Sequence, residues 1–104
     1  MAKYRITNKV IKDLENIWNY PVETWSERQA DAYYEMLISF CQHLADNPAC
    51  GKNYEEIAKD LYGFKASKHI IFYRVIAQDE IEIIRILHGR MDLKNRIRDK
   101  IRDN

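Results

Sequence analysis

The spacing of apolar residues changes once along the chain, from a helical period to a strand period. In the first part, apolar positions recur every three or four residues, which predicts amphipathic helices. Thr7 or Asn8 can cap the first helix, and Pro21 should end it. Its apolar positions are Val10, Ile11, Leu14, Ile17 and Trp18. A capping box at residues 26–29 starts a longer helix that ends before Pro48.

Shorter segments with alternating or β-branched residues predict four strands. Tyr4 and Ile6 alternate with basic residues in a short N-terminal strand. Residues 61–66, 69–77 and 81–88 read as three further strands, and their tight connections predict antiparallel hairpins. The two helices are joined by a few residues and should also form an antiparallel hairpin. We therefore expect an α+β fold in the order strand, helical hairpin, three-stranded antiparallel meander.

Both faces of the last two strands are largely apolar. Strict alternation places Ile81, Ile83, Arg85 and Leu87 on one face of the last strand, and Glu82, Ile84, Ile86 and His88 on the other. One helical hairpin can cover one face of a sheet, so the second face should expose apolar surface, which usually marks a partner site. The alternative is that a C-terminal helix carrying Ile97 and Ile101 covers it.

Composition limits the classes of function. A chain of 104 residues that is 46% hydrophobic forms one domain. Its net charge of +1 lacks the basic excess of strong nucleic-acid binders, although residues 94–104 carry five basic and two acidic side chains. Cys41 and Cys50 are not in a CxxC motif, and the sequence contains neither a signal peptide nor a membrane-length apolar run. We expect a soluble cytoplasmic protein with reduced thiols and no contact with the membrane.

Candidate chemistry gathers where the last strand ends. His88, Gly89, Arg90, Met91 and Asp92 follow each other there and fit either an acid–base site or an ordinary strand exit. Gly89 is expected to permit a backbone turn that other residues avoid. No phosphate-binding glycine loop, HExxH motif or serine nucleophile motif occurs in the sequence, so we expect no metal, cofactor or small-molecule substrate.

Two arginines lie within the predicted apolar strands. An unpaired charge would be costly at Arg74 or Arg85, so each should have a carboxylate partner or face an acidic partner segment. Asp92 is expected to pair with Arg90 or Arg85 and to have a structural role.

Five segments, in this order, carry a resemblance to a known family. They are KDLENIWNYPVETW, QADAYYEML, LADNPACGK, SKHIIFYRV and IIRILHGRMD. The sequence resembles the ParE branch of the RelE/ParE toxins of bacterial type II toxin–antitoxin modules over residues 4–93. It departs from the family pattern at Pro21 inside the first helical segment, at Ser26 where a glycine often follows the tryptophan, and in the extra residues after Leu93.

The resemblance implies a small toxin that is not an enzyme. Such toxins poison DNA gyrase by trapping it on cleaved DNA, and a ParD-like antitoxin neutralises them by covering their apolar surface. It implies a toxin domain at residues 1–93 with a basic tail at 94–104, in a homodimer or a toxin–antitoxin hetero-oligomer. The candidate residues for contacting the target or the antitoxin are Arg74, Arg85, His88, Arg90, Met91 and Asp92.

The same superfamily supplies a second hypothesis, a RelE-like ribosome-dependent mRNA endonuclease. Its acid, base and phosphate-binding groups would come from His69, Arg85, His88 and Arg90. Alternation separates these groups, because His69 and Arg85 fall at odd positions while Arg74 and His88 fall at even ones. RelE-like chains typically carry an arginine where this chain has Ile70, and they tend to be strongly basic. A third hypothesis is a degenerate, non-toxic binding module.

Overall fold

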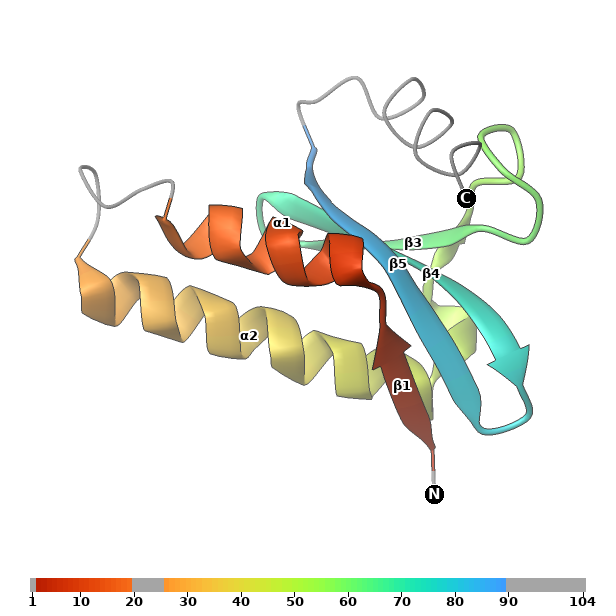
Figure 1. The fold of residues 1–104 in the computed structure, drawn as a ribbon. Coiled ribbons are helices and arrows are strands. Elements are labelled where there is room, and N and C mark those ends of the chain that lie inside the picture. The colour runs from red at the N-terminus through yellow and green to blue at the C-terminus, as the bar shows by residue number, and fades with distance from the viewer. Residues whose placement is uncertain (1, 20–25, 90–104) are drawn as a thin grey trace.

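The computed structural model describes residues 2–19 and 26–89, which form two helices packed on a five-stranded sheet (Figure 1). The elements are β1 (Lys3–Ile6), α1 (Asn8–Asn19), α2 (Glu27–Asp46), a 3-10 turn (Pro48–Cys50), β2 (Lys52–Asn53), β3 (Tyr62–Ala66), β4 (His69–Ala77) and β5 (Glu80–His88). The predicted α+β order is confirmed, and the two-residue strand β2 was not predicted. Residues 90–104, including the basic tail, lie outside the described part.

The sheet joins the two ends of the described chain. Its strand order is β1-β5-β4-β3-β2. β1 runs parallel to β5, with Lys3 opposite Glu80 and Ile6 opposite Ile83, and the other neighbours are antiparallel. The parallel pair arises because the helical hairpin crosses one face of the sheet before the chain enters the meander (Figure 1). β5 therefore has a strand on each side.

Local side-chain caps fix where the helices begin. Thr7 Oγ1 accepts the Val10 amide at 3.2 Å and donates to the Ile84 carbonyl at 3.2 Å, so the cap of α1 is also attached to β5. Ser26 and Gln29 form the predicted capping box of α2. After α2, Pro48 opens the 3-10 turn. Neither helix in the described residues is long and apolar enough to span a membrane.

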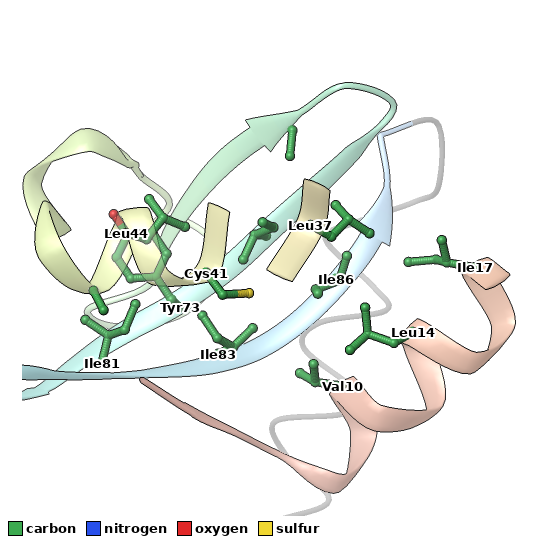
Figure 2. Close-up of a cluster of buried hydrophobic side chains, with 13 residues drawn as sticks. Val10, Leu14, Ile17, Leu37, Cys41, Leu44, Tyr73, Ile81, Ile83 and Ile86 are labelled. Carbon is green, nitrogen blue, oxygen red and sulfur yellow. The ribbon is translucent and has the colours of Figure 1, made fainter. Parts of the chain in front are cut away.

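The main core lies between the helical hairpin and the sheet. In Figure 2 apolar side chains from α1, α2 and the strands point toward one another. Its largest fully buried members are Val10, Leu37, Cys41, Leu44, Ile71, Tyr73, Ile81, Ile83 and Ile86. Full burial of each such aliphatic side chain contributes about 1.5–3 kcal/mol, so this cluster is the main source of stability. Ile11, predicted to be part of the buried stripe, is instead 43% exposed.

A bulge in β5 overturns the predicted alternation. Phe72 pairs with Arg85, but Tyr73 pairs with Ile83, so Ile84 is an extra residue in the ladder. Beyond this point the side chains change face. Ile86 joins the main core with Ile83, and Leu87 joins Ile84 on the opposite face. The assignment of Ile86 and Leu87 by strict alternation was therefore wrong.

The second face of the sheet is not the open apolar surface that we expected. Leu61, Phe72, Ile84 and Leu87 are buried there as a second cluster, with Tyr54, Ile57, Ala58 and Ile70 packed against it. The turns between β2 and β3 supply Tyr54, Ile57 and Ala58, which the sequence pattern left unassigned. Gly63 makes room for this packing, since a Cβ there would lie 2.7 Å from Tyr54 Cε2. On β4, Val75 and Ile76 remain exposed.

Candidate functional site

A buried ion pair holds α1 against β5. Arg85 Nε donates to Asp13 Oδ2 at 2.8 Å, and Arg85 Nη2 donates to Asp13 Oδ1 at 2.8 Å. The Ile86 amide also donates to Asp13 Oδ2, at 3.1 Å. Arg85 is 6% exposed and Asp13 is 8% exposed. The carboxylate partner predicted for Arg85 therefore exists in Asp13, and Asp92 lies outside the described residues.

This pairing changes what Arg85 can do. Two of its three guanidinium nitrogens are bound to Asp13, and the third, Nη1, is buried without an acceptor among the described residues. A guanidinium that is neutralised and covered in this way is poorly placed to reach an external ligand. This geometry favours a structural role for Arg85, while its contact with a partner or a phosphorane stays a prediction.

A second polar cluster forms at the same end of the sheet. His69 and His88 are directly opposite in the register of β4 and β5, with ring centroids 5.3 Å apart. Tyr33 of α2 reaches His69, its hydroxyl lying 2.6 Å from His69 Nδ1. The same hydroxyl accepts the Lys68 amide at 3.2 Å. The expectation that strand phase separates His69 from His88 was wrong, because the register between the two strands makes them neighbours.

Burial and nearby charges keep His69 neutral. Burial of the ring, followed by His88 and Lys68, lowers the pKa of His69 from 6.5 to about 4, against an opposing effect of Asp13. The Tyr33 hydroxyl can donate its one proton to His69 Nδ1 or to the Ala66 carbonyl at 3.5 Å, so the direction of the Tyr33–His69 hydrogen bond follows the His69 tautomer.

A cleft opens beside these histidines. It has a volume of about 440 Å³ and is lined by Lys65, Ser67, Lys68, His69, Ile70, His88 and Gly89. The β3–β4 turn forms one wall and the exit of β5 the other, joined by a hydrogen bond of 3.0 Å from the Gly89 amide to the Lys68 carbonyl. We call it the lysine cleft. Arg90, Met91 and Asp92 lie outside the described residues.

The prediction that Gly89 permits a backbone turn unavailable to other residues was wrong. It has no positive φ, and a Cβ there would meet the Lys68 carbonyl oxygen at an ordinary 3.6 Å.

Arg74 lies elsewhere on β4, opposite Glu82, and its Nε donates to the Lys59 carbonyl at 3.1 Å. It takes no part in the lysine cleft. Of the four residues in the ribonuclease hypothesis, the structure brings His69 and His88 together in that cleft.

The sequence left Asp13 and the two cleft lysines unassigned, although each carries a signal. Asp13 stands three residues after Val10 and four before Ile17, on the apolar stripe of its helix, where a carboxylate needs a partner. Lys65 and Lys68 lie on the two sides of a predicted tight turn, which places both at one end of the sheet.

A groove forms where α1, α2 and β1 meet. It has a volume of about 300 Å³ and is lined by Ile6, Ile11, Leu14, Glu15, Trp18 and Tyr34. Three of these are large exposed hydrophobic residues: Ile6, Ile11 and Tyr34. Trp18 is half-buried, and its indole donates to Asp31 Oδ1 at 2.8 Å. We call this surface the helix groove.

The thiols and acidic groups of the described residues do not suggest a metal site. No group of three or more His, Cys, Asp or Glu side chains in that part of the chain is placed to hold an ion. Cys41 is buried, and burial raises the pKa of its thiol to about 12, so it stays protonated. Cys50 is exposed, with its Sγ 3.8 Å from His43 Nε2.

Comparisons with known proteins agree on one family. Residues 4–93 match the family model for the ParE toxin of the type II toxin–antitoxin system parDE. Toxin ParE1 of Mycobacterium tuberculosis is 32% identical over 92 residues, covering 88% of this chain and 94% of the relative.

Two solved structures share the fold. The chromosomal ParDE toxin–antitoxin system of P. aeruginosa matches with a TM-score of 0.72 at 19% identity, covering 85% of this chain and 96% of that one. The toxin–antitoxin complex RelBE2 of M. tuberculosis matches with a TM-score of 0.61 at 18% identity, covering 84% and 96%.

The buried ion pair predicts a large cost for removing one partner. Asp13→Ala leaves the Arg85 charge buried and unpaired, so the free energy of unfolding should fall by about 3–5 kcal/mol in a urea titration. The double variant Asp13→Leu/Arg85→Met removes both charges and should be more stable than Asp13→Ala. The control is Arg5→Ala, which breaks the exposed Arg5–Glu80 contact of 2.7 Å and should cost about 0–1 kcal/mol. Equal losses in Asp13→Ala and Arg5→Ala would contradict the assignment.

The lowered pKa of His69 predicts a pH dependence of stability. In the unfolded chain the His69 imidazole takes up a proton near pH 6.5, whereas in the folded chain it does so only near pH 4. The free energy of unfolding is therefore highest above pH 6.5 and falls as the pH is lowered to about 4. The loss should be about 1–2 kcal/mol, because solvent screens a partly exposed ring. Urea titrations across this range should give a flatter profile for His69→Gln. Parallel profiles in the two proteins would show that His69 is not the group responsible.

Proposed function

The chain belongs to the ParE toxin family of type II toxin–antitoxin systems, and from this membership we propose that it inhibits growth by poisoning DNA gyrase. In this proposal the toxin acts in the cytoplasm, binds gyrase on cleaved DNA and performs no chemistry itself. Residues 1–93 form the toxin domain, in line with the family match over 4–93, and residues 94–104 form a basic tail. A cognate ParD-like antitoxin neutralises it.

The observation that carries binding rather than catalysis is the occupation of Arg85 by Asp13. RNA cleavage needs a cation close to the phosphorane, and Arg85, the one arginine of the ribonuclease hypothesis among the described residues, is already neutralised. Ile70, which stands where RelE-like chains carry an arginine, is opposite Leu87 and packs against the second apolar cluster. Both facts favour a binding protein.

One observation favours the second candidate, a RelE-like mRNA endonuclease. The lysine cleft holds two imidazoles and two lysines, the types of group that acid–base cleavage of RNA uses. The neutral state of His69 would suit a base, but its pKa of about 4 makes it a weak one. A degenerate, non-toxic module remains the third candidate.

The antitoxin is proposed to cover the helix groove. Type II antitoxins are proteins, and large exposed apolar residues bordering a groove mark a protein interface. The groove has Ile6, Ile11 and Tyr34 at its exposed border. Of the contact residues proposed from the sequence, Arg74 and His88 remain candidates, as do Arg90, Met91 and Asp92. Contact through Arg85 stays a prediction too, although its geometry favours a structural role.

Gyrase poisoning predicts a specific product with purified components. Gyrase incubated with the toxin, plasmid and ATP should supercoil less and accumulate linear DNA after detergent and protease treatment. The control is the toxin mixed with its antitoxin, which should restore supercoiling. A toxin without effect on gyrase that cleaves mRNA on ribosomes would replace this proposal with the endonuclease. If expression without antitoxin leaves growth unaffected, the non-toxic module is the better description.

The groove proposal predicts a position-dependent loss of antitoxin affinity. Ile11→Asp places a charge where an apolar side chain would be buried, and should weaken the Kd for the antitoxin at least tenfold by titration calorimetry. The matched control is Val75→Asp, which alters an exposed apolar residue outside the groove and should bind normally. Equal affinities for the two variants would rule out the groove. A free toxin that sediments as a dimer disrupted by Ile11→Asp would assign the groove to a second copy.

A further inference from the structure

We propose that the lysine cleft binds a phosphate group of a DNA backbone, so that the toxin itself holds DNA. The proposal goes beyond gyrase poisoning, because it gives this chain its own nucleic-acid contact. The proposal rests on the proposed function in one respect: the DNA that the cleft binds would be the segment held by gyrase. Binding can therefore be measured without gyrase, and the two ideas can fail separately.

The lining of the lysine cleft favours an anion. Lys65 at the end of β3 and Lys68 in the β3–β4 turn are exposed, and His69 and His88 lie on β4 and β5 in the same cleft. Among the lining residues that the structure describes there is no carboxylate. A cleft with basic groups and no acidic one concentrates positive potential, which attracts an anion. This local field exists although the whole chain has a net charge of only +1.

The cations of the lysine cleft suit a phosphate group. The described lining contains lysines, and a lysine ammonium is a compact point charge that binds phosphate oxygens. It also pairs with carboxylates, so the peptide arm of the test separates the two kinds of anion. The volume of about 440 Å³ has room for a phosphodiester with its flanking sugars. Ser67 at the tip of the turn adds a hydroxyl donor.

Tyr33 ties one imidazole of the cleft to the turn that carries Lys68. Tyr33 holds His69 through Nδ1 and also accepts the Lys68 amide, so one hydroxyl fixes both the ring and the turn. Burial is the main cause of the lowered pKa of His69, and His88 and Lys68 lower it further. An anion bound beside the ring favours its protonated form, so binding should raise the pKa of His69 above about 4.

Two measurements on the full-length toxin without gyrase test the proposal. The first follows the His69 imidazole by NMR during titration with inorganic phosphate, then with a 20-base-pair duplex, both of which should shift its signals and raise its pKa. The second measures duplex binding by fluorescence anisotropy at several salt concentrations. Lys65→Ala/Lys68→Ala should weaken the Kd at least tenfold and lower the slope of log Kd against log salt by about 2.

The matched control loses the same two charges elsewhere. Lys3→Ala/Lys12→Ala changes exposed lysines on β1 and α1 and should bind DNA within about threefold of the wild type at low salt. Equal weakening in the two double variants would overturn the proposal, because bulk charge would then explain binding. It is also overturned if free phosphate shifts His69 but DNA does not, or if a glutamate-rich peptide binds the cleft while DNA does not. Loss of DNA binding with intact gyrase poisoning would separate the two functions.

Discussion

The buried ion pair between Asp13 and Arg85 connects the helical layer to the sheet and sets the geometry around it. Asp13 accepts two hydrogen bonds from Arg85 and a third from the Ile86 amide, next to the bulge in β5. Because of the bulge, the successive side chains of Arg85 and Ile86 both reach the helices. In a regular strand only one of the two would do so. A buried pair of this kind gains little net stability over apolar packing but leaves an unpaired charge if the register slips. It therefore specifies how α1 sits on β5.

The same ion pair determines which cations are left at the end of the sheet that carries the lysine cleft. Because Arg85 is neutralised by Asp13, the cations available to a ligand there among the described residues are the lysines of the β3–β4 turn. The register pairs His69 with His88, and the two imidazoles line the same cleft as those lysines. Tyr33 then joins α2 to the same place, so three elements hold one cleft. The geometry suits anion binding better than acid–base catalysis.

The helix groove and the lysine cleft share no lining residue. The groove is apolar and is built from α1, α2 and β1, whereas the cleft is basic and is built from the β3–β4 turn and the end of β5. A protein partner and a nucleic-acid phosphate prefer these two environments respectively. The two surfaces of this small domain therefore differ in chemistry, as the proposed binding of an antitoxin and of DNA would require.

Local features were determined by the sequence alone. The capping box at Ser26 and the β-branched runs of β4 and β5 act within a few residues, so the elements were predicted close to their observed bounds. Contacts between distant residues were decided by the tertiary structure. Asp13 meets Arg85 72 residues away, and the turns at residues 54–61 cover a face expected to be open. The extra residue Ile84 depends on packing across the sheet and could not be read from alternation, whereas the pairing of His69 with His88 follows from the tight turn between Ala77 and Glu80.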